Sequence, residues 1–321
     1  MSKKNIYNNP IVLERADPWV YKHTDGYYYF TGSVPGYQEI EVRRAKNLNE
    51  LEDGEKSSIW HAHKEGEMSK LIWAPEIHFI QGKWYIYFAA ASDDRVEKGT
   101  FQHRMYVLEC ADENPLIGDW IEKGQVKTAF ESFSLDATTF ELHDRLYYVW
   151  AQKDPVIPGN SNLYISEMEN PWTLTGSQIL LSLPEYDWEK VGFMVNEGPA
   201  VVIRNDKVFI TYSASATDEN YCMGLLWANV NDNLLNGYNW HKSKTPVFVT
   251  SEEELLFGPG HNSFTMNEDG EVDVLIFHAR PKKVTEIEPL DVPDRHAHAK
   301  FFTWDEKGFP LFNKIEVNNL N

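Results

Sequence analysis

Five residues with ionisable or aromatic side chains recur at equivalent places in the sequence, each about nine residues before a turn. They are Asp17, Trp73, Asp136, Glu197 and His261. Glu197 is the most informative of them, because it precedes Gly-Pro inside VGFMVNEGPAVVIRNDKVFITYS, a stretch that otherwise has the composition of a buried strand. A carboxyl group among aliphatic side chains loses hydration, which raises its pKa and costs stability unless the group has a partner. Glu197 is therefore a candidate for acid–base chemistry.

Three carboxyl groups brought together have the chemistry that hydrolysis of a glycosidic bond requires. One must be protonated to give a proton to the leaving oxygen, and one must be ionised. In an inverting enzyme the ionised group activates a water molecule across roughly 6.5–9.5 Å, and a third carboxylate can keep the proton on the acid by repulsion of like charges. Any one of the five residues is explained equally well as a turn residue. Their common register favours a functional site.

The elements that must position these residues are five similar segments of the chain. Each has a short strand, a turn, and a second strand rich in aromatic and β-branched residues, which predicts a hairpin. The five turns lie at residues 25–26, 81–82, 143–144, 205–206 and 269–270. The segments are ADPWVYKHTDGYYYFTGS, WAPEIHFIQGKWYIYFAAAS, LDATTFELHDRLYYVWAQK, NEGPAVVIRNDKVFITYSAS and GHNSFTMNEDGEVDVLIFHAR.

The spacing of the hairpins predicts a five-bladed β-propeller in a single domain over residues 1–321. The period is about 60 residues, which leaves room for outer strands such as MYVLECA, NLYISEM, MGLLWANV and HAKFFTWDEKGFPLF after each hairpin. A two-sheet sandwich would also give many short strands, but it would not explain the regular long period. In a propeller the first strand of every blade lines the central channel, so the five residues would form a ring at one mouth.

Composition limits the partners of this chain. The sequence has 49 acidic and 30 basic residues, a formal net charge of −19, which disfavours nucleic acid and anionic membranes and suits a neutral ligand.

The N-terminus MSKKNIYNNPIVLERADPW carries Asn and Pro where a secretory signal has its apolar core, so we expect a cytoplasmic protein. Cys110 and Cys222 lie in apolar, strand-like contexts, and we expect buried free thiols.

The sequence resembles glycoside hydrolase family 43, the five-bladed propeller arabinofuranosidases, arabinanases and β-xylosidases. The resemblance covers essentially the whole chain and rests on RADPWV, WAPE, LDATTF, NEGPAV, GPGHNSF, HAR and FFTWDEKGFPLF. It implies an inverting mechanism with Asp17 as general base, Asp136 as pKa modulator and Glu197 as general acid. It also implies that Arg280 binds sugar hydroxyls. No catalytic cofactor is implied, but His261 would hold a structural calcium or sodium ion near the axis through water.

Chain topology adds residues to the mouth of the channel. If each first strand starts at this mouth, each second strand ends there, and the loops after the second strands form the rim. We therefore expect Phe30, Asn160 and Arg280 at the mouth, and Trp73 against the face of a sugar ring.

Within the family, the sequence looks most like exo-acting α-L-arabinofuranosidases that release terminal residues from arabinan or arabino-oligosaccharides. This choice rests on resemblance alone, and β-xylosidase on xylo-oligosaccharides remains an alternative. A propeller that binds sugar without cleaving it is an alternative of another class, although it would not need three desolvated acids. We expect a small oligosaccharide as substrate, and the sequence is compatible with a homo-oligomer.

Overall fold

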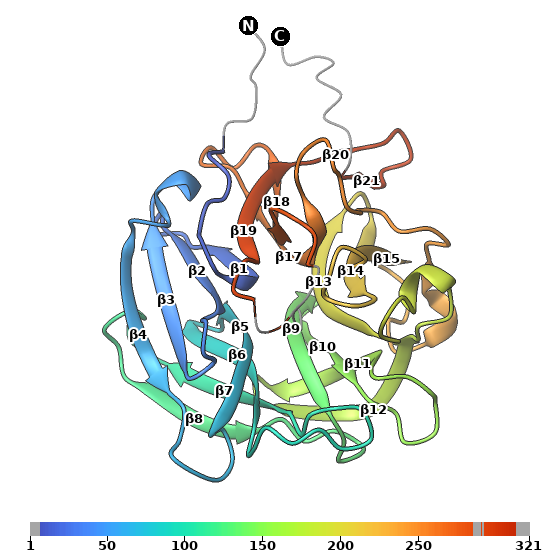
Figure 1. The fold of residues 1–321 in the computed structure, drawn as a ribbon, viewed down its shortest axis with the longest axis horizontal. Helices are drawn as coiled ribbons and strands as arrows, with labels where there is room; N and C mark the ends of the chain where they lie inside the picture. The colour runs from blue at the N-terminus through green and yellow to red at the C-terminus, as the bar shows by residue number, and fades with distance from the viewer. Residues whose placement is uncertain (1–6, 285–289, 291, 313–321) are drawn as a thin grey trace, which may run out of the picture.

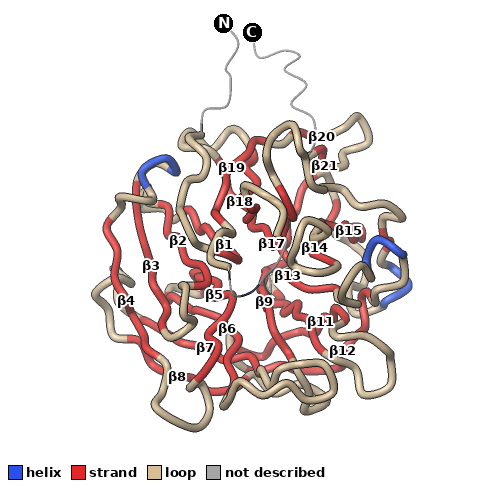
Figure 2. Tube along the Cα trace, in the orientation of Figure 1, coloured by secondary structure: helices blue, strands red, loops and turns tan. Residues whose placement is uncertain are grey.

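The computed structural model describes residues 7–284, 290 and 292–312 of the 321-residue chain. Their strands form five sheets round a common centre, four of them with four strands and one with three (Figure 1). A separate two-stranded sheet follows, and the helices are short turns at the periphery (Figure 2). None of the helices in these ranges is long and apolar enough to cross a membrane.

The elements follow one another as the repeat predicts. The first sheet contains β1 (Ala16–Lys22), β2 (Tyr28–Ser33), β3 (Glu39–Ala45) and β4 (Glu55–His61); the second contains β5 (Lys70–Ile80), β6 (Lys83–Ala91), β7 (Arg104–Cys110) and β8 (Trp120–Gln125); the third contains β9 (Ser134–Leu142), β10 (Arg145–Gln152), β11 (Asn162–Asn170) and β12 (Thr173–Ser182). The fourth contains β13 (Asn196–Arg204), β14 (Lys207–Ala214), β15 (Cys222–Asn229) and β16 (His241–Lys242); the fifth contains β17 (Phe257–Met266), β18 (Asp273–Arg280) and β19 (His296–Phe301). The small sheet pairs β20 (Thr303–Trp304) with β21 (Pro310–Leu311), and the 3₁₀ helices are η1 (Leu48–Glu50), η2 (Asp187–Glu189) and η3 (Gly237–Asn239).

The five predicted hairpins are confirmed, each joining the first two strands of a sheet. In the second, third and fourth sheets the connection has two residues, both with positive φ, as a type I′ turn requires. The first and fifth hairpins have longer connections.

The five-bladed propeller is confirmed by the arrangement of the first strands. β1, β5, β9, β13 and β17 each contact the next around the centre, and β17 contacts β1, so the ring is closed (Figure 1). The segment before β1 completes the fifth blade, because Ile11 N donates to Ala297 O at 2.8 Å and Ala297 N donates to Val12 O at 2.8 Å. The pairing of this segment with β19 therefore joins the first and last blades.

The core lies between neighbouring blades rather than in a single centre. Trp84 on β6 and Trp150 on β10 are fully buried in two such clusters. Cys110 and Cys222 are buried free thiols, as expected. This packing fixes the inner strands and hence the side chains that they turn toward the axis.

Candidate active site

Every inner strand has a β-bulge at the same level. In each hairpin the first strand has one more residue than its partner between two paired positions, for example between Glu197 and Ala200 against Ser213 and Thr211. The first bulge residue has positive φ in all five strands: Asp17 (56°), Ala74 (45°), Asp136 (51°), Gly198 (54°) and His261 (43°). Such bulges bend a strand and redirect its side chains, so the repeated bulge builds the mouth of the channel.

The five residues do not all occupy the same position relative to the bulge, which differs from the common register that we expected from sequence. Asp17, Asp136 and His261 occupy the bulge, whereas Trp73 and Glu197 each precede it by one residue. The count failed because the hairpin connections differ in length between blades. All five side chains nevertheless line one cavity of about 290 Å³.

The cavity is bordered by the loops that follow the second strands, as chain topology predicts. Tyr37 follows β2, Phe101 follows β6, Asn160 follows β10 and Thr217 follows β14, and all four line the cavity. Trp73 stacks on His103 with ring centroids 4.0 Å apart, and Phe101 meets Trp73 edge-on at 5.2 Å. One wall of the cavity is therefore aromatic, a surface suited to the apolar face of a sugar ring.

Asp17 is buried and surrounded by donors and positive charge. Ser33 Oγ donates to Asp17 Oδ2 at 2.6 Å, His261 Nδ1 lies 3.2 Å from Oδ1, and Arg295 Nη1 lies 3.4 Å from Oδ1. Burial raises the pKa of Asp17, but the charges of His261 and Arg295 outweigh it and hold the pKa well below its usual range. Asp17 is thus ionised at neutral pH.

Asp136 and His261 form the centre of the acidic group. Gly198 N donates to Asp136 Oδ2 at 3.0 Å, and His261 Nδ1 lies 3.9 Å from the same oxygen. Burial and the charge of Asp17 raise the pKa of Asp136 to about 6, although His261 opposes them. Burial opposes the charge on His261, but Asp17 and Asp136 raise its pKa to about 10, so an imidazolium lies between the two carboxylates.

Glu197 has the opposite electrostatic environment from Asp17. Tyr221 Oη donates to Glu197 Oε1 at 2.9 Å, and the N–H of the next residue, Gly198, donates to Asp136 Oδ2 at 3.0 Å. Burial, and then repulsion by Asp136, raise the pKa of Glu197 to about 8. Two carboxyl groups in one cavity therefore differ in protonation at neutral pH, Glu197 neutral and Asp17 charged.

Two of the residues expected at the mouth lie elsewhere. Phe30 is 1% exposed and packs in the core between the first and fifth blades, because it pairs with Val20 and its side chain faces the neighbouring sheet. Arg280 is 1% exposed, forms an ion pair with Asp294 and donates to Thr217 O at 3.2 Å, so it braces a rim loop instead of lining the cavity. Asn160 does line the cavity, and its Nδ2 donates to Gly99 O at 3.1 Å.

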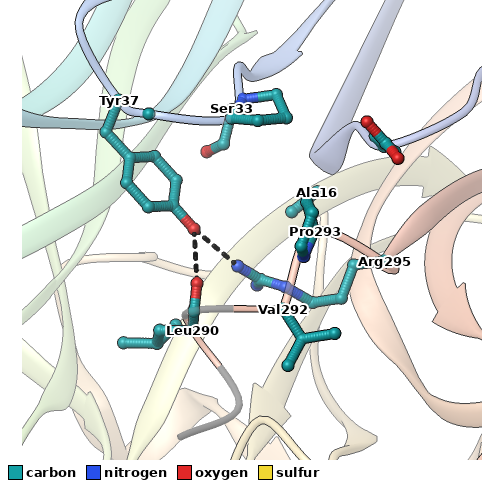
Figure 3. A pocket seen from close by; sticks show the side chains of 10 residues that line it. Ala16, Ser33, Tyr37, Leu290, Val292, Pro293 and Arg295 are labelled. Carbon is teal, nitrogen blue, oxygen red and sulfur yellow. Dashed lines mark hydrogen bonds between the residues drawn. The ribbon is translucent and has the colours of Figure 1, made fainter. Parts of the chain in front are cut away.

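Arg295 takes the position that sequence reasoning gave to Arg280. Its Nη2 lies 3.4 Å from Tyr37 Oη, which in turn donates to Leu290 O at 3.2 Å (Figure 3). These three residues separate the acidic cavity from a second one of about 300 Å³, which Ser33 also lines. Arg295 was missed because it precedes β19 in VPDRHAHAK, outside the five hairpins.

The cation expected at His261 does not fit the arrangement of this residue. Among residues 7–284, 290 and 292–312, no group of three or more His, Cys, Asp or Glu side chains could hold a metal ion. His261 Nδ1 lies 3.2 Å from Asp17 Oδ1 and is engaged in this ion pair. The described residues therefore offer the expected cation no set of ligands.

Comparison with known proteins finds relatives over nearly the whole chain. The sequence model of glycosyl hydrolases family 43 matches residues 7–310. An alpha-L-arabinofuranosidase from Lactobacillus brevis, known from a crystal structure, is 54% identical and superposes with a TM-score of 0.94, covering 95% of this chain and 96% of that one.

Two Streptomyces proteins named extracellular exo-alpha-(1->5)-L-arabinofuranosidase are also similar. The Streptomyces avermitilis protein is 50% identical over 306 residues, 95% of this chain and 63% of that protein. The Streptomyces chartreusis protein is 53% identical over 277 residues, 86% of this chain and 83% of that protein. This chain thus spans less than two thirds of the first relative. Their names overturn the cytoplasmic location that we expected from the N-terminus, and that prediction is wrong.

Proposed function

This chain belongs to glycosyl hydrolases family 43, and we propose that it is an exo-acting α-L-arabinofuranosidase that hydrolyses its substrate with inversion of configuration at the anomeric carbon. The observation that carries the proposal is the difference in protonation between two carboxyl groups of one cavity. The pKa of Glu197 is raised to about 8, whereas that of Asp17 is held well below its usual range. A pair of titratable groups whose pKa values are pushed apart is the signature of an acid and a base.

Glu197 is the general acid in this proposal. It is neutral at pH 7 because burial and the charge of Asp136 disfavour its ionised form. A neutral carboxyl can protonate the glycosidic oxygen as the bond to the anomeric carbon breaks, so the leaving sugar departs as an alcohol.

Asp17 is the general base. Its charge is stabilised by His261 and Arg295, and Ser33 fixes one of its oxygens at 2.6 Å. The other oxygen can accept a proton from a water molecule that attacks the anomeric carbon. The attack inverts the configuration because no covalent intermediate with the enzyme is formed.

Asp136 is the pKa modulator. It accepts a hydrogen bond from Gly198 N at 3.0 Å, directly beside the acid, and its negative charge keeps the proton on Glu197. The imidazolium of His261 balances the charge of Asp17 and Asp136, which would otherwise repel each other in a buried site. No metal ion or organic cofactor enters these steps, since the chain itself supplies the acid and the base.

The cavity supports action on a terminal sugar. Its volume of about 290 Å³ is at the lower end of the range for ligand pockets, which suits one sugar ring better than a chain. Trp73 supplies the stacking face and Arg295 and Asn160 supply donors at the edge. The names of the three similar proteins favour arabinofuranose as that sugar.

Hydrolysis of matched aryl glycosides tests the proposal. The protein should release the phenol from an aryl α-L-arabinofuranoside much faster than from an aryl β-D-xyloside at equal concentration, and it should release arabinose from α-1,5-arabinotriose. Asp17→Ala is the control for contaminating activity. A preference for the xyloside would assign the β-xylosidase alternative, and binding of arabinose without any hydrolysis would assign the non-catalytic one.

A further inference from the structure

Tyr221 touches the acid of the proposed mechanism from behind the cavity. It lies in the loop between β14 and β15, it is 1% exposed, and it does not line the cavity. Its hydroxyl donates to Glu197 Oε1 at 2.9 Å. Burial and the nearby charge of Glu197 raise the pKa of Tyr221 well above its usual value, so the phenol keeps its proton.

The ring of Tyr221 fits into a socket that needs glycine. A Cβ added at Gly260 would lie 2.6 Å from Tyr221 Cε1, and one added at Gly258 would lie 3.3 Å from Tyr221 Cβ. No real Cβ atom makes the shorter of these contacts, so position 260 must be Gly for the ring to stay where it is. Gly260, which the proposed mechanism does not use, is thus explained by the place of this ring, whereas Gly258 is required by its φ of 58° and by the backbone oxygen of Asp218, which a Cβ there would meet.

The ring of Tyr221 also stacks on His278. The two rings are stacked, with centroids 5.5 Å apart and an interplanar angle of 12°. His278 Nδ1 accepts a hydrogen bond from Asp17 N at 3.0 Å, and burial lowers the pKa of His278 to about 3, which keeps Nδ1 free to accept. A continuous series of contacts therefore runs from the backbone of the base, through His278 and Tyr221, to the carboxyl of the acid.

We propose that Tyr221 is a positioning residue of this enzyme, which orients the carboxyl of Glu197 for proton transfer and is held in place by Gly260 and His278. The inference rests on the proposed function and adds to it a residue outside the cavity. A carboxyl group bound at Oε1 by a buried donor loses a rotational freedom, so its other oxygen points to one place. The same donor stabilises the carboxylate that remains after the proton has left.

The sign of the effect on pH dependence follows from the groups that face Glu197. Burial, Asp136 and Asp17 favour its neutral form, whereas His261 and the hydroxyl of Tyr221 favour its ionised form. Removal of the Tyr221 hydroxyl takes away one of the two influences that favour the ionised form of Glu197, so the pKa of Glu197 should rise. A purely structural tyrosine would not produce this shift.

The test compares Tyr221→Phe with Tyr85→Phe. The control removes a similar bond, from Tyr85 Oη to Glu109 Oε2 at 2.8 Å, between two residues that do not line the cavity. We expect Tyr221→Phe to lower kcat/KM on α-1,5-arabinobiose about tenfold and on an aryl arabinofuranoside with an acidic phenol less than about twofold. The alkaline limb of kcat/KM should move up by about one pH unit. Tyr85→Phe should leave the ratio of substrates and the limb unchanged.

Three outcomes decide the matter. An upward shift with the expected substrate dependence supports the role of Tyr221. Equal slowing of both substrates, a limb that stays in place, or wild-type activity on both substrates overturns it. In each of these cases the variant still hydrolyses arabinofuranosides, so the proposed function stands. If Tyr221→Phe does not fold, Gly260→Ala displaces the same ring, and a wild-type pH profile in that variant overturns the role.

Discussion

Asp136→Asn provides a sharp quantitative test of the acid's environment. The variant keeps the shape of the side chain and an oxygen that can accept from Gly198 N, but it removes the negative charge beside Glu197. With a pKa of about 8, Glu197 is about 90% protonated at pH 7. A neighbouring charge shifts a pKa by about 1–3 units, so a loss of about 1–2 units would leave about half to a tenth of the acid protonated at pH 7.

The predicted effect of Asp136→Asn therefore depends on pH. At pH 7 the ratio of variant to wild-type kcat/KM should be about two- to tenfold lower than at pH 5. The pH-dependent part of the difference should vanish at pH 5 because Asp136, with a pKa of about 6, is itself largely protonated in the wild type there. Any loss from lost substrate contacts is the same at every pH and does not disturb the ratio.

The assay is a pH series of kcat/KM on α-1,5-arabinobiose, with Asp154→Asn as the matched control. Asp154 also accepts backbone hydrogen bonds, from Val156 and Ile157 at 2.7 and 2.8 Å, but it lies outside the cavity. The control should follow the wild-type profile. An alkaline limb that stays in place or moves up in Asp136→Asn would refute the view that Asp136 keeps the proton on Glu197.

Three further expectations concern the base, the stereochemistry and the domain. Asp17→Ala should lower kcat by at least about a hundredfold on good and poor leaving groups alike, since water must be activated in both cases; substantial turnover in steady-state kinetics would remove Asp17 from the role. Time-resolved proton NMR should detect β-L-arabinofuranose first from an α-linked substrate, and initial retention would contradict a single displacement. We propose that residues 1–321 form one domain, so calorimetric and van't Hoff enthalpies of unfolding should agree, and two separate transitions would contradict it.

Much of the fold and the acidic group could be predicted because both depend on repetition. The five hairpins share turn chemistry and strand composition, and these local signals act alike in every blade. The bulge was not predictable by counting, because a bulge adds a residue in the inner strand while the turns vary independently in length. Glu197 was assigned to the cavity even though Gly198, not Glu197, occupies the bulge.

The remaining site residues depend on contacts between distant segments. Arg295 reaches Asp17 across 278 residues of sequence, and Tyr221 reaches Glu197 from the loop before an outer strand. Neither position has a periodic signal of its own. Arg280 and Phe30 were expected at the mouth from their places in second strands, since Arg280 ends β18 and Phe30 lies within β2. Both are buried instead, because side chains alternate between the two faces of a strand.

The central claim is that Glu197 gives its proton to the leaving group, and the most direct measurement is the kinetics of Glu197→Gln on two substrates. Glutamine keeps the shape but cannot donate that proton. The variant should lose about 100-fold or more of kcat/KM on α-1,5-arabinobiose, far less on an aryl arabinofuranoside whose phenolate leaves without help, and its alkaline limb should disappear. Equal loss on both substrates with the alkaline limb retained would contradict the assignment of Glu197 as the acid.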